Sequence, residues 1–170
     1  MVLDLKQLFG NVGGAKKLDA EFDFSDLEFG GVFPITTPVK ITGEILSKTE
    51  IVEMKAKIYA DYSADCDRCG EPTTKHYCFE VNKTLVTELA NAEEDDDVIV
   101  MPDMRLDLED LTRAEVVLNL PIKHLCREEC KGICADCGKN LNEGECGCDK
   151  TVIDPRLEAL RRLLDAESTN

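Results

Sequence analysis

Hydrophobic and polar positions alternate with a period of two along several short segments of this chain. Apolar residues alternate with charged or polar ones from Leu18 to Phe24, from Val39 to Gly43 and from Met54 to Ala60, and a fourth segment of this kind is expected over residues 75–86. A period of two is typical of a β-strand with one buried and one solvated face. The pattern therefore predicts an antiparallel sheet, which we expect to curl into a barrel-like shape.

Three other segments have helical character. The first ten residues are amphipathic, and Asp107 to Leu120 carries apolar residues at helical spacing before Pro121 ends it. Near the C-terminus, Asp154 is placed to cap a helix that has Pro155 at its first position. The fold class expected is α+β. We predict a β-rich main domain with an N-terminal helix over residues 1–120, a cysteine-rich segment over 121–150, and a helix over 151–170.

Composition narrows the class of protein. The 170 residues are 43% apolar, and no apolar run approaches the roughly 20 residues that span a bilayer, so we expect no membrane segment. The N-terminus lacks the pattern of a signal peptide, which predicts a cytoplasmic protein in a reducing compartment. The net charge of -15 favours basic partners over bare nucleic acid.

The nine cysteines are better explained by metal binding than by disulfides, because the count is odd and cytosolic thiols stay reduced. Cys134 and Cys137 form a C-x-x-C-G knuckle, and Cys146 and Cys148 follow shortly after. So short and polar a segment has almost no core of its own, and structural zinc supplies on the order of 10 kcal/mol in small peptides. We therefore predict one Zn²⁺ on Cys134, Cys137, Cys146 and Cys148.

A second zinc site is suggested by another knuckle, Cys66 and Cys69, at the end of a predicted strand. Cys126 and Cys130 could complete it and so attach the tail to the sheet. An alternative assignment places Cys130 in the first site, and the spacing does not choose between the two. Cys78, within a strand, is expected to be a small buried residue.

Nothing in the sequence indicates catalysis. His76 and His124 are the only histidines, and neither has the spacing of a metalloprotease or a deaminase. Cys66 and Cys69 lead into another strand rather than opening a helix, which argues against a thioredoxin-like redox pair. We predict a protein that is not an enzyme.

Several segments together resemble a known family. The strings CDRCGEP, LNLPIKHLC, ECKGICADCGKNLNEGECGC and DPRLEALRRLL resemble the YceD-like family of large ribosomal RNA subunit accumulation proteins, in its Gram-positive-type form. The N-terminal LDLKQLFG and the long strand region before CDRCG also fit. The resemblance implies a role in biogenesis of the large ribosomal subunit in bacteria, and it brings no catalytic residues with it.

Three functions are then considered. The first is an assembly factor that binds a basic ribosomal protein or a pre-ribosomal particle, for which the acidic run at 90–97 is a candidate surface through Glu93, Glu94, Asp95, Asp96 and Asp97. The second is a zinc-dependent module that binds ribosomal RNA directly through Lys123, Arg127, Lys131 and Lys139. Few aromatic residues are present for base stacking, so the second ranks lower. A redox or metal-storage role is a third alternative. No small-molecule substrate is expected.

Overall fold

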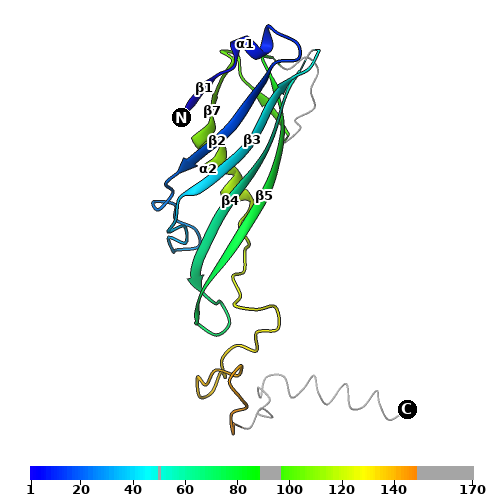
Figure 1. The fold of residues 1–170 in the computed structure, drawn as a ribbon. Helices are drawn as coiled ribbons and strands as arrows, with labels where there is room; N and C mark the ends of the chain where they lie inside the picture. The colour runs from blue at the N-terminus through cyan, green and yellow to red at the C-terminus, as the bar shows by residue number, and fades with distance from the viewer. Residues whose placement is uncertain (50, 89–96, 149–170) are drawn as a thin grey trace, which may run out of the picture.

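The computed structural model describes residues 1–49, 51–88 and 97–148 (Figure 1). Its main feature is a five-stranded sheet with the strand order β2-β3-β4-β5-β6. The strands are β2 (Ala15–Phe22), β3 (Val39–Ser47), β4 (Val52–Asp65), β5 (Pro72–Val86) and β6 (Val98–Val100). The first three pairings are antiparallel, as the sequence predicts, while β6 runs parallel to β5.

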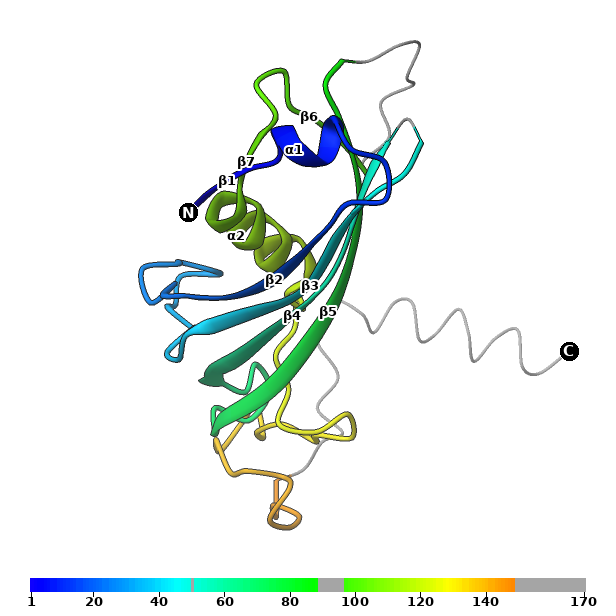
Figure 2. The same ribbon diagram turned by 45° about the horizontal axis from the view of Figure 1, so that its top comes forward.

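One face of the sheet forms the core of the molecule. Alternate residues of β4 from Val52 to Tyr62 are buried, and so are Leu18, Ile41 and Val81 on neighbouring strands. Helix α2 (Leu108–Asn119) and the short α1 (Lys6–Phe9) lie on this core face (Figure 2). The predicted strands and the helix before Pro121 are thus present, and the α+β class is confirmed.

Helix α2 begins where the sequence provides a cap. The carboxylate of Asp107 accepts hydrogen bonds from the backbone N–H groups of Glu109 and Asp110, which have no partner within the helix. Leu108 and Val116 are fully buried on its inner side. Capping and an apolar stripe therefore place this helix on the sheet.

The first ten residues differ from the predicted amphipathic helix. They form strand β1 (Val2–Asp4) and then the four-residue α1. Strand β1 pairs antiparallel with β7 (Arg105–Asp107), and the N–H of Leu5 donates to the carbonyl oxygen of Met104 at 2.9 Å. Strand β7 lies about a hundred positions after β1 in the chain, so the local pattern of apolar residues does not predict this pairing.

The sheet is curved but open, so the predicted barrel-like closure is not confirmed. Its edges in the described chain are β2 and β6, and α1, α2 and the β1–β7 pair occupy the space that a closing strand would need (Figure 2). Strands β3 and β4 approach each other closely at Gly43, which lies opposite Ala56.

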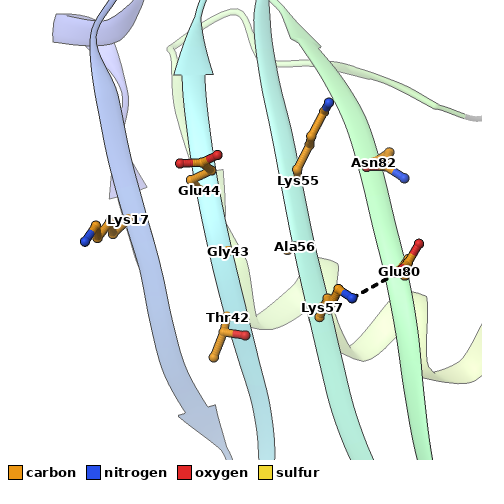
Figure 3. A pocket seen from close by; sticks show the side chains of 9 residues that line it. All are labelled: Lys17, Thr42, Gly43, Glu44, Lys55, Ala56, Lys57, Glu80 and Asn82. Atoms are coloured by element: carbon orange, nitrogen blue, oxygen red, sulfur yellow. Dashed lines mark ion pairs between the residues drawn. The ribbon is translucent and has the colours of Figure 1, made fainter.

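The other side of the sheet, here called the open face, is polar. Lys17, Glu44, Lys55, Lys57 and Glu80 project from it around a shallow hollow of about 460 Å³ (Figure 3). Lys57 and Glu80 form an ion pair at 3.0 Å. Cys78 also lies on this face and is exposed, so the expectation that it is buried is wrong: its position in the register of β5 points it away from the core.

Beyond α2 the chain leaves the sheet. Residues 121–148, here called the tail, contain turns and one isolated bridge between Ile133 and Asn140. They extend past the hairpin end of β4 and β5, opposite α1 (Figures 1 and 2). The helix predicted over 151–170 lies outside the described residues. Among those described, no helix is both long enough and apolar enough to cross a membrane.

Candidate metal centres

The turn between β4 and β5 forms the first cysteine knuckle. Cys66 and Cys69 are buried in it, and Gly70 takes a φ of 71°, a conformation that suits glycine. The N–H of Gly70 donates to the carbonyl oxygen of Cys66 at 2.8 Å, and the N–H of Cys66 donates to that of Glu71 at 2.9 Å. These bonds turn the chain back into β5 with both sulfurs on the same side.

The tail supplies the other two cysteines of this group. Asp67 and His124 are joined twice: the N–H of Asp67 donates to the carbonyl oxygen of His124 at 2.9 Å, and the N–H of His124 donates to the Asp67 carboxylate at 2.7 Å. The Arg68 guanidinium donates to the carbonyl oxygen of Cys130 at 2.9 Å. Cys126 and Cys130 are thereby held against the knuckle.

The four sulfurs have the spacing of a tetrahedral metal site. Cys66 Sγ lies 3.8 Å from Cys130 Sγ, and Cys69 Sγ lies 3.7 Å from Cys126 Sγ. A tetrahedron of thiolates with metal–sulfur bonds of about 2.3 Å places its sulfurs about 3.8 Å apart. Disulfide sulfurs are separated by only about 2 Å. This group, the first centre, can therefore hold a metal ion.

A second centre lies farther along the tail. The thiols of Cys134, Cys137, Cys146 and Cys148 all lie within 4.8 Å of one another. Its knuckle repeats the first: the N–H of Gly138 donates to the carbonyl oxygen of Cys134 at 2.9 Å, and Gly138 has a φ of 72°. Of the two assignments for Cys130 that the sequence left open, the structure groups it with Cys66, Cys69 and Cys126.

Backbone amides favour thiolates in both knuckles. Burial raises the pKa of Cys66, but N–H groups of Cys126, Arg68 and Cys69 outweigh it and bring that pKa to about 6. N–H groups of Cys137 and Asp136 bring the pKa of Cys134 to about 6 in the same way. Each centre therefore contains at least one cysteine that is readily ionised, as a metal ligand must be.

Each centre also contains a thiol that holds its proton strongly. A bond from the Cys137 side chain, together with burial, raises the pKa of Cys148 to about 12. The N–H of Glu71 lowers the pKa of Cys69, but burial and neighbouring thiols outweigh it and raise that pKa to about 12. A cation in place of these protons would offset the electrostatic repulsion among four closely spaced thiolates.

Two asparagines from the segment between the cysteine pairs of the second centre form hydrogen bonds at the first centre, and the sequence analysis did not identify them. The Asn142 side-chain amide donates to Cys130 Sγ at 3.3 Å and to Asn140 Oδ1 at 2.9 Å. Asn140 in turn donates to the Glu71 carboxylate at 2.9 Å. Their position between two cysteine pairs is the one sequence signal that could have singled them out.

The candidate partner-binding residues are dispersed. Lys123, Arg127, Lys131 and Lys139 are all exposed on the tail, and Lys139 Nζ donates to the Glu145 carbonyl oxygen. Asp97 is exposed and lies 3.3 Å from Lys83 Nζ, whereas Glu93, Glu94, Asp95 and Asp96 lie outside the described residues.

Comparison with known proteins gives a consistent set of relatives. Residues 54–164, more than half of the chain, match a protein family that is described as large ribosomal RNA subunit accumulation protein YceD. A chloroplastic protein of Arabidopsis thaliana, named large ribosomal RNA subunit accumulation protein YCED homolog 1, is 24% identical over 72% of this chain. The uncharacterized protein YlbN of Bacillus subtilis is 26% identical over 75% of this chain. An uncharacterized protein of Mycobacterium bovis is 31% identical over 72% of it.

The relatives differ in how much of their own length is matched. The match covers 47% of the Arabidopsis protein, 60% of the mycobacterial protein and 75% of YlbN. No solved structure matches the chain.

Proposed function

This chain belongs to the YceD family of large ribosomal RNA subunit accumulation proteins, and from that membership we propose that it supports biogenesis of the large ribosomal subunit and accumulation of its RNA. We propose further that it acts without catalysis, by binding a basic ribosomal protein or a ribonucleoprotein precursor. The family match is the observation that carries the general role.

Charge supports a basic protein partner over bare RNA. The whole chain has a net charge of -15, and the tail itself is not basic: its four lysines and arginines are outnumbered by five acids, Glu128, Glu129, Asp136, Glu143 and Glu145. An acidic surface speeds association with a basic partner and repels phosphate. The run at residues 93–97 contributes five of the carboxylates.

Structural zinc is proposed for both centres. Cys66, Cys69, Cys126 and Cys130 would hold one Zn²⁺, and Cys134, Cys137, Cys146 and Cys148 a second. Four thiolates fill the tetrahedron and leave no open position for water, which is typical of a structural site. When bound, the ions would cross-link a segment that has little apolar core.

The alternative function is direct binding of ribosomal RNA by the zinc-bound tail. The exposure of Lys123, Arg127, Lys131 and Lys139 favours it. It predicts an affinity that falls steeply with salt and is lost when these four residues are neutralised. An affinity for RNA that stays unchanged after neutralisation would exclude this alternative.

The proposed function is tested by depleting the protein in its own cells and measuring the ratio of large- to small-subunit ribosomal RNA. We expect the ratio to fall and precursors of the large subunit to accumulate in a sucrose gradient. Re-expression of the wild-type chain should restore both, and so should Cys78→Ser, because Cys78 lies outside both centres. An unchanged ratio would contradict the proposal.

A second experiment tests the acidic run. Replacing residues 93–97 by lysines should weaken cross-linking to basic large-subunit proteins, because it exchanges attraction for repulsion. Lysine replacements at Asp19 and Glu21, which are exposed on the open face, are the control. If the two variants cross-link equally well, residues 93–97 have no special part in binding.

A further inference from the structure

A cavity of about 330 Å³ lies beside the first centre, where the end of β4, the loop after β2 and the tail meet. It is separate from the cluster of sulfurs, although Cys66 contributes to its wall. The residues that give it chemical character are Phe29, Val32, Tyr62, Asp65, Asp67 and His124.

Aromatic rings form part of the wall. The rings of Phe29 and Tyr62 are nearly perpendicular, with centroids 6.4 Å apart, and the Tyr62 ring lies 4.6 Å from the His124 imidazole. Such rings offer flat, electron-rich surfaces to a cation. The wall therefore suits a planar group that carries positive charge.

His124 forms part of the wall, and one hydrogen bond fixes its imidazole. Its side chain is almost completely buried, with 3% of the residue exposed. Nε2 lies 3.2 Å from the carbonyl oxygen of Thr73, which only accepts, so Nε2 carries the proton. Nδ1 is buried and has no hydrogen-bond partner among the described residues. Nδ1 thus lies behind the cavity wall, and a group in the cavity does not reach it.

The charge of the cavity is negative. Asp65 and Asp67 line it, and no lysine or arginine is among the described residues that do. Burial, and after it the Asp67 carboxylate, raises the pKa of Tyr62, so the negative field extends to the aromatic wall. Four thiolates around one divalent cation keep a net negative charge, and Cys66 would bring that charge to the edge of the cavity.

We propose that this cavity binds the guanidinium group of an arginine side chain on a basic protein partner. The inference rests on the proposed function, since it says how such a partner would be held. A guanidinium is planar, stacks on aromatic rings and has five N–H donors for the Asp65 and Asp67 carboxylates. An ammonium lacks the flat face, and the phosphate of a nucleotide would be repelled by the two carboxylates.

The cavity depends on the tail being held against the sheet. Ile122 and His124 form one side of it, and both precede the cysteines that join the first centre. Loss of zinc from that centre should therefore weaken arginine binding as well. This couples the metal to recognition of the partner.

The test is an NMR titration of the zinc-loaded full chain with the peptide acetyl-Gly-Arg-Gly-amide. We expect it to shift the ring resonances of Phe29, Tyr62 and His124. The same peptide with citrulline, which keeps the shape but loses the charge, should bind roughly tenfold more weakly, because charge-assisted hydrogen bonds are lost. Equal binding of the two peptides would overturn the inference, as would the same shifts caused by adenosine monophosphate instead of the arginine peptide.

Variants give the matched control. Asp65 is exposed, so Asp65→Asn should keep the fold and weaken arginine binding by roughly tenfold. Asp103→Asn changes an exposed residue between β6 and β7 that does not line the cavity, and it should leave binding unchanged. Equal affinities of the two variants would overturn the inference. If the arginine peptide fails to bind while depletion still lowers large-subunit RNA, the cavity assignment alone is wrong. If it binds as expected while depletion has no effect, the proposed function alone is wrong.

Discussion

A single substitution can test whether the Asn142 side chain supports metal binding at the first centre. Its amide donates to Cys130 Sγ at 3.3 Å, and this bond is the main cause that lowers the pKa of Cys130. Hydrogen bonds to metal ligands commonly contribute about tenfold or more to metal affinity. We expect Asn142→Ala to weaken zinc binding at the first centre by about tenfold.

A chromophoric chelator in competition with the protein measures this change. Asn82→Ala, on the open face of the sheet, serves as the control and should bind zinc as the wild type does. If Asn142→Ala and Asn82→Ala lose zinc at the same chelator concentration, the amide plays no part in the centre.

An ion pair between β5 and α2 is largely shielded from solvent. Lys83 Nζ lies 3.1 Å from Glu115 Oε1, and their side chains are 11% and 10% exposed. Glu115→Ala would remove this shielded partner of the ammonium, which also lies 3.3 Å from the exposed Asp97 carboxylate, and should lower the free energy of unfolding by about 2 kcal/mol. Urea unfolding of the zinc-loaded chain measures the loss.

The exposed pair of Lys57 and Glu80 gives the comparison, since its atoms are equally close, at 3.0 Å, but its side chains are 53% and 70% exposed. Glu80→Ala should leave the unfolding midpoint nearly unchanged, because exposed pairs contribute little. Equal effects of Glu115→Ala and Glu80→Ala would show that burial does not strengthen the inner pair.

Strands β3 and β4 depend on the absence of a side chain at Gly43. A Cβ there would collide with the Lys55 carbonyl oxygen and would lie 2.6 Å from Ala56 Cα. Gly43→Ala should therefore force the strands apart and destabilise the protein by about 2–3 kcal/mol. The urea midpoint reports this change.

Gly10→Ala is the control, because its Cβ would lie 3.6 Å from the Lys6 carbonyl oxygen, an ordinary contact, and its φ of -90° is open to alanine. A midpoint for Gly43→Ala as high as that for Gly10→Ala would mean that the two strands can separate at little cost.

At the scale of elements, the sequence predicts what local patterns determine. Alternation identifies the long strands, and Asp107 and the apolar positions after it identify α2. The β1–β7 pair and the parallel β5–β6 pair depend on contacts between distant residues, and short strands such as Val98–Val100 carry too few positions for a period to show. Whether the sheet closes depends on which elements pack against it, and the alternation of apolar and polar residues does not reveal this.

In the molecule as a whole, the first centre joins cysteines of the β4–β5 turn to cysteines of the tail. Replacing both Cys66 and Cys69 by serine should abolish metal binding at this centre and release residues 121–148. We expect trypsin to cut rapidly after Lys123, Arg127 and Lys131, which are exposed in the tail, while the sheet stays resistant. Mass spectrometry of timed digests measures the cleavage.

Cys78→Ser changes a cysteine outside both centres and should be cut as slowly as the wild type. Equal cleavage rates for the double variant and for Cys78→Ser would mean that the hydrogen bonds of Asp67 and Arg68 hold the tail without metal.

The candidate site was predictable only as far as spacing carries the information. The C-x-x-C-G strings at Cys66 and Cys134 indicate two knuckles, and the structure shows that both take the same backbone form. Which knuckle receives Cys130 depends on how the tail folds back through Asp67 and His124. The cavity could not be predicted, because Phe29, Tyr62 and His124 meet only in the folded molecule.

Native mass spectrometry of the full chain tests the central structural claim most directly, because it counts the metal ions bound to each molecule. We predict two Zn²⁺ per wild-type chain, one for the double variant at Cys66 and Cys69, and none after treatment with a strong chelator. A wild-type chain that carries one zinc ion or none would contradict the assignment of eight cysteines to two structural centres.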